Sequence, residues 1–360
     1  MQKVHLVVQH QEKHSDGCSQ HLYGFKGPLL TVLIGFALFA LPMNVLAGNS
    51  MEDVFKHLRM TEDQKKDFLQ HKVITFSDEK VSDRDIPVGM VGLFEGSAEE
   101  AIQIFREAQQ FKAVSIMKGF GKIDGAGTPG DFSGAVLTPN GPKEADRYLI
   151  AEPGADLNLS PKEITAFQDL NKSLKDSDNR QKKVEELLHK TLLARYQAYR
   201  AGGVSSIAPF DRGDGDLFQP GAELEKTMQG SDWLKTRFPT FYKFLLNYPS
   251  EKLSGVDDQF FWVNFDVLGR PNFALTHRTS FQDGDKYVFF ERHFYTSHDY
   301  NTLEQMGVVL PSDEGTVVAF LYRISTDQVA GFGSTVKGAA ARKLIEGPLE
   351  EVFAEQRKKK

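Results

Sequence analysis

The chain has 360 residues, of which 40% are hydrophobic, 11% aromatic and 26% charged, a composition typical of a globular protein rather than a disordered, collagen-like or polytopic one. A formal net charge of −6 offers no basic field to a nucleic-acid backbone, so no nucleic-acid partner is expected. The single cysteine excludes an internal disulfide framework and every metal site built from several cysteines.

The amino-terminal segment has the features of an export signal. Residues 28–47 read PLLTVLIGFALFALPMNVLA, and the apolar core, 29–41, is typical of a signal peptide and short for a membrane span. The small residues Val45 and Ala47 stand where a signal peptidase requires them. We therefore predict a signal peptide over 1–47 and a periplasmic or secreted protein. The alternative is an uncleaved segment that anchors the chain to the membrane.

Residues 48–159 are predicted to form an amino-terminal α+β part. Thr61 and Ser97 begin capping boxes, and the second precedes an apolar face at helical spacing. Residues 72–76 and 86–94 read as strands. A stretch rich in glycine and proline then leads to the next part of the chain.

Residues 160–250 are predicted to be a helical insertion. Ser160 caps a helix whose first turn contains a proline. A longer helix follows and ends at Gly202. Its apolar stripe, which we assign to the core, consists of Val184, Leu187, Leu188, Thr191, Leu192, Tyr196 and Tyr199.

Residues 251–360 are predicted to complete the same domain with antiparallel strands and a final helix. The strands are rich in aromatic and β-branched residues and cover 260–268, 272–281, 286–295 and 316–325. The helix follows Thr335 and uses Val336, Ala340 and Leu344.

This order of elements is similar to that of START-like (helix-grip) proteins, in which a curved antiparallel sheet wraps a long carboxy-terminal helix over a cavity. The resemblance is one of pattern across about two thirds of the chain after the signal. It implies an α+β fold with a curved antiparallel sheet, a long carboxy-terminal helix and a helical insertion.

Three segments resemble a family of uncharacterised exported bacterial proteins. They are YRAGG at 199–203, YTSH at 295–298 and the stretch 322–332. That family often has two cysteines around 152–156, and this chain has neither, so a disulfide or thiol role is absent there. The resemblance implies export and brings no known activity.

The hairpin around Asp283 and Gly284 contains most of the candidate site residues. A loop centred on that pair places His277 opposite Phe290. Alternation then puts Phe273, Leu275, His277, Thr279, Phe281, Val288, Phe290, Arg292 and Phe294 on one face. The other face collects Thr276, Arg278, Ser280, Tyr287, Phe289, Glu291, His293 and Tyr295.

The first face has the character of a cavity wall, because it is apolar with a few isolated polar groups. We predict ligand contacts from His277, Thr279, Phe290, Arg292 and Phe294, with His277 and Arg292 orienting the ligand. The alternative for His277 is a core histidine bonded to a carbonyl or hydroxyl group. The leading hypothesis is an exported protein that binds a small apolar or amphipathic, lipid-like ligand between the sheet and the carboxy-terminal helix.

Two other functions stay open. One is a cofactor-free hydrolase, isomerase or cyclase with His277 or His298 as the general base, since the unperturbed pKa of histidine lies near neutrality. His298 could instead cap local backbone. The other is an envelope structural or interaction protein. The chain has no HExxH or HxH pair and no strand–GxGxxG–helix unit, so we predict no metal and no cofactor.

Overall fold

The computed structural model of the chain describes residues 51–154, 156–175 and 179–329. These residues all belong to one compact unit. The signal peptide expected over 1–47 and the helix expected after Thr335 lie outside the described residues.

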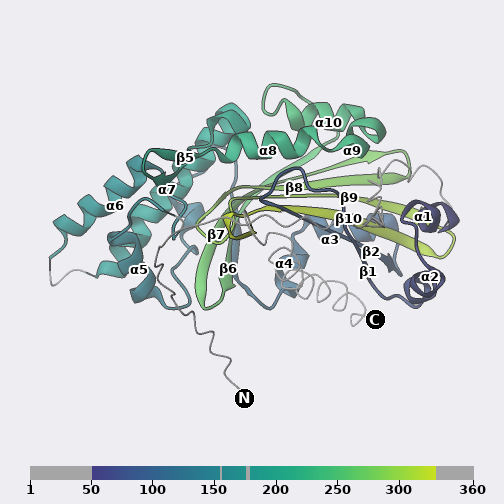
Figure 1. Ribbon diagram of the computed structural model, residues 1–360, viewed down its shortest axis with the longest axis horizontal. Helices are drawn as coiled ribbons and strands as arrows, with labels where there is room; N and C mark the ends of the chain where they lie inside the picture. Colours follow the sequence, from purple (N-terminus) through teal and green to yellow (C-terminus); the bar gives the residue numbers. More distant parts are fainter. Residues whose placement is uncertain (1–50, 155, 176–178, 330–360) are drawn as a thin grey trace, which may run out of the picture. The chain divides into compact units, whose positions relative to one another are not determined.

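An eight-stranded antiparallel sheet forms the centre of this unit (Figure 1). Its strand order is β1-β2-β10-β9-β8-β7-β6-β3, so the last five strands form a meander and the amino-terminal part adds strands at both edges. The strands are β1 (Ile74–Phe76), β2 (Asp85–Phe94), β3 (Met117–Lys122), β6 (Asp257–Val267), β7 (Arg270–Asp283), β8 (Lys286–Thr296), β9 (Thr302–Ser312) and β10 (Gly315–Ser325).

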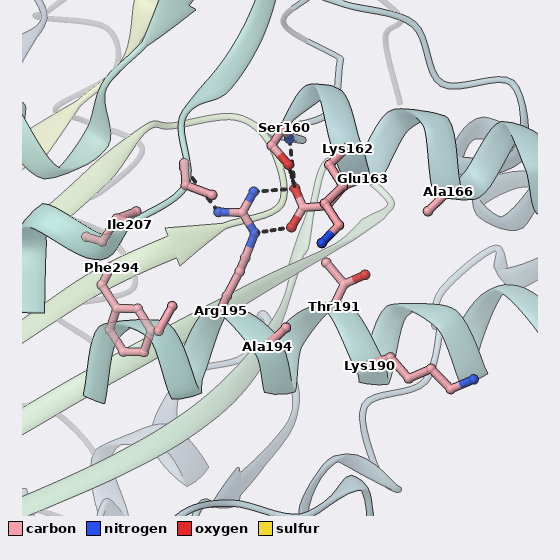
Figure 2. A pocket seen from close by; sticks show the side chains of 12 residues that line it. Ser160, Lys162, Glu163, Ala166, Lys190, Thr191, Ala194, Arg195, Ile207 and Phe294 are labelled. Atoms are coloured by element: carbon pink, nitrogen blue, oxygen red, sulfur yellow. Dashed lines mark hydrogen bonds and ion pairs between the residues drawn. The ribbon is translucent and has the colours of Figure 1, made fainter. Parts of the chain in front are cut away.

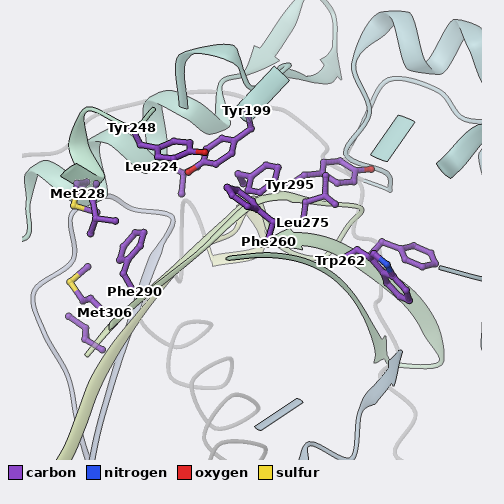
Figure 3. Packing of buried hydrophobic residues seen from close by; sticks show 14 of the residues in the cluster. Tyr199, Leu224, Met228, Tyr248, Phe260, Trp262, Leu275, Phe290, Tyr295 and Met306 are labelled. Carbon is purple, nitrogen blue, oxygen red and sulfur yellow. The ribbon is translucent and has the colours of Figure 1, made fainter. Parts of the chain in front are cut away.

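Helices cover both faces of the sheet, which is why the central strands are buried along most of their length. One face, here called the broad face, shares a large apolar cluster with the first two helices, with α5 (Gly141–Leu149) and with the helices of residues 160–250. The first two helices are α1 (Met51–His57) and α2 (Glu62–Leu69), and those of residues 160–250 are α6 (Pro161–Ser173), α7 (Arg180–Gly202), α8 (Pro220–Gln229), α9 (Asp232–Arg237) and α10 (Pro239–Leu246). Figure 3 shows part of this cluster. The opposite face packs against α3 (Ala98–Arg106) and α4 (Gln109–Ala113).

Short elements complete the described chain. They are the two-stranded sheet of β4 (Phe210–Gly213) and β5 (Asp216–Phe218) and the 3₁₀ turns η1 (Pro129–Phe132), η2 (Gly203–Ser206) and η3 (Asp327–Val329).

Local sequence signals set the helix starts. The capping boxes predicted at Thr61 and Ser97 are formed, and the cap predicted at Ser160 is formed as well, with Glu163 completing a capping box. The predicted stripe of α7 is also confirmed, since its members are buried except for the partly buried Leu187. Together with Arg195, the stripe turns one side of this long helix toward the core.

The expected START-like arrangement is wrong. The last long elements that the structure describes are the strands β6–β10, not a long carboxy-terminal helix. The insertion helices α7, α8 and α10 cover the broad face, because their apolar residues share its cluster. The order of the elements does not tell which helix covers the sheet, because several helices of this chain have an apolar side that could pack on it.

The hairpin of β7 and β8 differs from the prediction in register. Its loop is Gly284-Asp285, so Asp283 pairs with Lys286 and His277 faces Arg292 rather than Phe290. Gly284 has a φ of +65°, as the first central residue of a type II′ loop requires. The slip is two residues, and an even slip leaves each side chain on its predicted face.

A bulge changes the predicted face of one residue. Leu275 pairs with Tyr295 and Thr276 with His293, so Phe294 is the extra residue on β8. Tyr295 therefore packs in the apolar cluster of the broad face, beside Phe294, instead of on the opposite face.

Candidate functional site

A pocket of about 290 Å³ opens between α6 and α7 (Figure 2). The pocket exists because its walls contain small side chains. Ala166 on α6 and Ala194 and Ala198 on α7 line it, where larger residues would fill the space. Ile207 and Phe294 add apolar wall. The remaining lining residues are Ser160, Lys162, Glu163, Lys190, Thr191, Arg195 and Ala208. The volume lies just below the range of about 300–1,000 Å³ that small-molecule sites occupy.

A buried ion pair forms one side of the pocket. Arg195 Nε and Nη2 donate to the two carboxylate oxygens of Glu163 at 2.8 and 2.5 Å, and Nη1 donates to the carbonyl of Ala208 at 3.3 Å. The second Glu163 oxygen also accepts from the backbone N–H and the hydroxyl of Ser160. The Arg195 guanidinium lies 4.3 Å from the ring centre of Tyr295. Both charges are therefore matched within the protein.

Two lysines at the pocket are free of such pairing. Lys162 on α6 and Lys190 on α7 are exposed, and neither ammonium has an ion-pair partner among the described residues. In Figure 2 the side chain of Lys162 reaches from α6 into the gap toward α7, whereas Lys190 runs along the outside of α7. The pocket thus has an apolar interior and a cationic rim.

Phe294 connects the pocket to the centre of the sheet. It is the bulge residue of β8, and its ring stacks on Tyr199 of α7 at a centroid distance of 4.1 Å. Bulges often re-aim a side chain beside a binding site. Tyr199 stacks in turn against Tyr248, and both lie over the strands in Figure 3.

His277 lies beneath this aromatic layer and is only 1% exposed. Its Nε2 is 2.9 Å from Asp258 Oδ1 and its Nδ1 is 2.9 Å from the hydroxyl of Tyr199. A carboxylate only accepts, so Nε2 carries the proton and Nδ1 accepts from Tyr199. Burial lowers the pKa of His277, although Asp258 opposes this shift. The imidazole is neutral, as a core histidine with two partners would be.

The remaining predicted ligand contacts also lie in packed surroundings. Arg292 pairs with Glu304, with Nε 2.8 Å from the carboxylate, and with the hydroxyl of Tyr199 at 3.3 Å. Thr279 and Phe290 are buried in the sheet, and the hydroxyl of Thr279 has no hydrogen-bond partner within the described ranges. Of the five predicted contacts, Phe294 is the one that lines the pocket.

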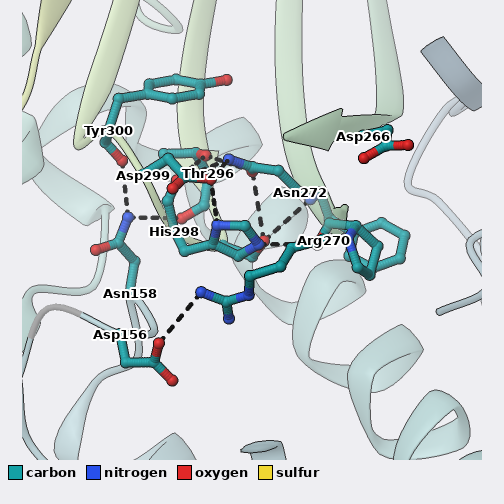
Figure 4. Close-up of polar contacts among 12 residues, drawn as sticks. Asp156, Asn158, Asp266, Arg270, Asn272, Thr296, His298, Asp299 and Tyr300 are labelled. Carbon is teal, nitrogen blue, oxygen red and sulfur yellow. Dashed lines mark hydrogen bonds and ion pairs between the residues drawn. The ribbon is translucent and has the colours of Figure 1, made fainter. Parts of the chain in front are cut away.

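His298 lies in a separate polar network at the end of β8 (Figure 4). It is 2% exposed, its Nδ1 contacts Asp299, and its Nε2 is 3.0 Å from the carbonyl of Pro271. Burial opposes ionisation of Asp299, but the hydrogen bond from His298 holds the pKa of that carboxyl below its usual value. Asn158 joins the network to the segment before α6 by donating to the carbonyls of Thr296 and Tyr300.

The geometry does not bring His277 and His298 into one site. Each histidine has its own partners, and both ring nitrogens of each are bonded to protein atoms. Within the described ranges, no group of three or more histidine, cysteine or carboxylate side chains is placed to hold a metal ion.

Sequence reasoning missed the pocket itself. It assigned the whole α7 stripe to the core, although Thr191 of that stripe lines the pocket together with its neighbours Ala194 and Ala198. The available signal was weak: Ala194 and Ala198 are four residues apart and hence on one side of α7, flanked by Lys190 and Arg195.

In comparisons with family models, curated proteins and solved structures, nothing matches this chain. The resemblance to an exported bacterial family therefore stays a prediction. Within the part of the chain that the structure describes, no helix has both the length and the apolar character needed to cross a bilayer.

Proposed function

We propose that this protein binds a small apolar or amphipathic ligand in the pocket between α6 and α7. The observation that carries the proposal is the pocket's interior, in which alanine methyl groups, Ile207 and Phe294 leave an apolar space of about 290 Å³. Such a space attracts apolar surface out of water, at about 25 cal/mol per Å² buried. The site differs from the cavity expected under a carboxy-terminal helix, because the sheet face there is covered by the insertion.

The histidines favour binding over acid–base chemistry. A general base needs a ring nitrogen within hydrogen-bond reach of a substrate proton. Both nitrogens of His277 and of His298 are instead occupied by protein partners, and neither side chain lines the pocket. The catalytic roles of these two residues stay predictions without a supporting contact.

The signal-like segment 1–47 adds a proposal about location. If it directs export, the ligand is met in the periplasm or outside the cell. Immunoblotting of periplasmic and cytoplasmic fractions, with amino-terminal sequencing of the purified protein, tests export and cleavage after Ala47.

Ligand uptake tests the binding proposal. The purified protein is titrated with Nile red, a neutral apolar dye, and native mass spectrometry with solvent extraction looks for a retained ligand. Ala198→Leu fills the pocket and should abolish uptake. Ala201→Leu adds the same side chain to an exposed position of α7 outside the pocket, so it should bind as the unmodified protein does. If Ala198→Leu and Ala201→Leu take up the same amount of Nile red, the dye does not bind in the pocket between α6 and α7.

A further inference from the structure

We infer that the ligand of this pocket is a single-chain amphipathic anion, whose negatively charged head lies at the rim beside Lys162 and Lys190. This inference rests on the proposed function and names the chemical class that the site selects. The inference is based on the charges around the pocket: Arg195 and Glu163 form an ion pair, whereas the two lysines have no ion-pair partner among the described residues.

The pocket lining is positively charged in a chain that is negative overall. Three cations, Lys162, Lys190 and Arg195, line it together with one carboxylate, Glu163. The net charge of the whole chain is −6, so composition does not account for this excess. Arg195 and Glu163 neutralise one another through two hydrogen bonds. The two lysines are left as the unmatched charge.

The position of Lys162 makes this excess a local feature of the site. It stands in the first turn of α6, where the positive end of the helix dipole disfavours cations. The ammonium therefore adds to the positive potential of that helix end instead of offsetting it. The backbone N–H of Ser160 is already taken by Glu163, so a ligand anion would meet the lysines rather than the cap.

The size of the pocket limits the ligand's tail. A space of about 290 Å³ fits one short chain rather than the paired chains of a membrane phospholipid. Ala166, Ala194, Ala198, Ile207 and Phe294 supply the apolar wall, and the exposed side chains of Lys162 and Lys190 lie where the pocket meets solvent, which orients a ligand with its head toward solvent. A medium-chain carboxylate has this chemistry.

Three ligands with the same tail separate the contribution of the head from that of the pocket. Octanoate, 1-octanol and octylammonium are each used to displace bound Nile red at low ionic strength. Octanoate should bind about three- to tenfold more tightly than 1-octanol, as two exposed ion pairs would provide, and octylammonium most weakly. The preference should shrink in about 0.5 M salt, where such charges are screened.

The outcomes distinguish the two proposals. Equal affinities for the three ligands, with uptake still lost in Ala198→Leu, would overturn the anionic head and leave apolar binding standing. Failure of all three to displace the dye would overturn the binding proposal itself.

Two double variants test whether Lys162 and Lys190 cause the preference for octanoate over 1-octanol. Lys162→Gln with Lys190→Gln should abolish the preference for octanoate and leave the affinity for 1-octanol unchanged. Lys182→Gln with Lys183→Gln removes the same charge from exposed positions of α7 outside the pocket, so the preference should persist. An equal loss in both double variants would show a long-range effect of net charge and contradict a head site at the rim.

Discussion

The hydroxyl of Tyr199 lies 2.9 Å from Nδ1 of His277, and this contact joins the longest described helix to the centre of the sheet. It is one link in a buried chain of polar groups. His277 donates to Asp258 and accepts from the hydroxyl of Tyr199. Arg292 donates to the same hydroxyl and to Glu304. Each member is satisfied only while the others hold their positions, so we expect this chain to stabilise the packing of α7 on the sheet.

His277→Phe should destabilise the protein by about 1–3 kcal/mol, because the ring fits the aromatic layer but leaves the buried hydroxyl of Tyr199 without its acceptor. Urea denaturation measures the loss. Dye uptake by the folded variant should be unchanged, since His277 does not line the pocket. Unchanged stability with reduced uptake would restore His277 as a ligand contact.

Stability should fall as the pH drops below about 6.5, with a contribution from His277. Its pKa in the folded state is lowered, so the unfolded chain takes up a proton that the folded protein does not, and unfolding is favoured. Asp258 acts in the same direction at lower pH. Burial opposes its ionisation, but the hydrogen bond from His277 keeps its pKa below the usual value.

The pH effect is checked by urea denaturation of the unmodified protein and His277→Gln between about pH 7 and pH 5. The unmodified protein should lose up to about 1.4 kcal/mol more per pH unit than the variant, the limit for one proton. Titrating groups that do not contact His277 cancel in this difference, and Asp258, which does, remains ionised in the unmodified protein over this pH range. A gap between the two proteins that does not change with pH would show that His277 titrates alike in both states.

Glu163→Gln should destabilise the protein by about 3 kcal/mol, because it leaves the buried Arg195 guanidinium without its counter-charge. Glutamine retains one oxygen for the capping box at Ser160, but its NH2 group then faces Arg195 Nε, so the loss includes that hydrogen bond as well as the charge. In a double-mutant cycle by chemical denaturation, Glu163→Met combined with Arg195→Met should cost less than the sum of the two single changes. Strict additivity would mean that the pair contributes no coupling.

Leu268→Asn should stabilise the protein by about 0.5–1 kcal/mol. Leu268 is 92% exposed, and it has a φ of +54° in the two-residue loop between β6 and β7, where the next residue is Gly269. A left-handed conformation is costly for leucine and common for asparagine, which hairpin loops favour before glycine. Leu268→Ala is the control, because alanine keeps the steric cost. An equal gain from both variants would attribute the effect to removal of an exposed apolar side chain.

Sequence patterns were reliable where the physical cause is local. The capping boxes at Thr61, Ser97 and Ser160 each depend on groups three residues apart, and all three are formed. The α7 stripe follows from helical spacing. Alternation placed Phe290, Arg292 and His277 on one face of the β7–β8 hairpin despite a register error of two residues, because an even slip preserves the face.

Other features were not visible in the alternation of polar and apolar residues. The two-residue loop of the hairpin set its register, and the bulge at Phe294 turned Tyr295 onto the broad face. The position of α7 gave His277 a partner 78 residues away in the chain.

Three helix starts, the faces of the β7–β8 hairpin up to its bulge and the lack of an internal disulfide could be read from the residues alone. The covering of the sheet by α7, α8 and α10, and the pocket between α6 and α7, depend on how separate elements pack. A buried face leaves a repeating pattern of large apolar side chains in the sequence. A pocket comes instead from small residues on two separate helices, and Ala166 gains its meaning only beside Ala194 and Ala198.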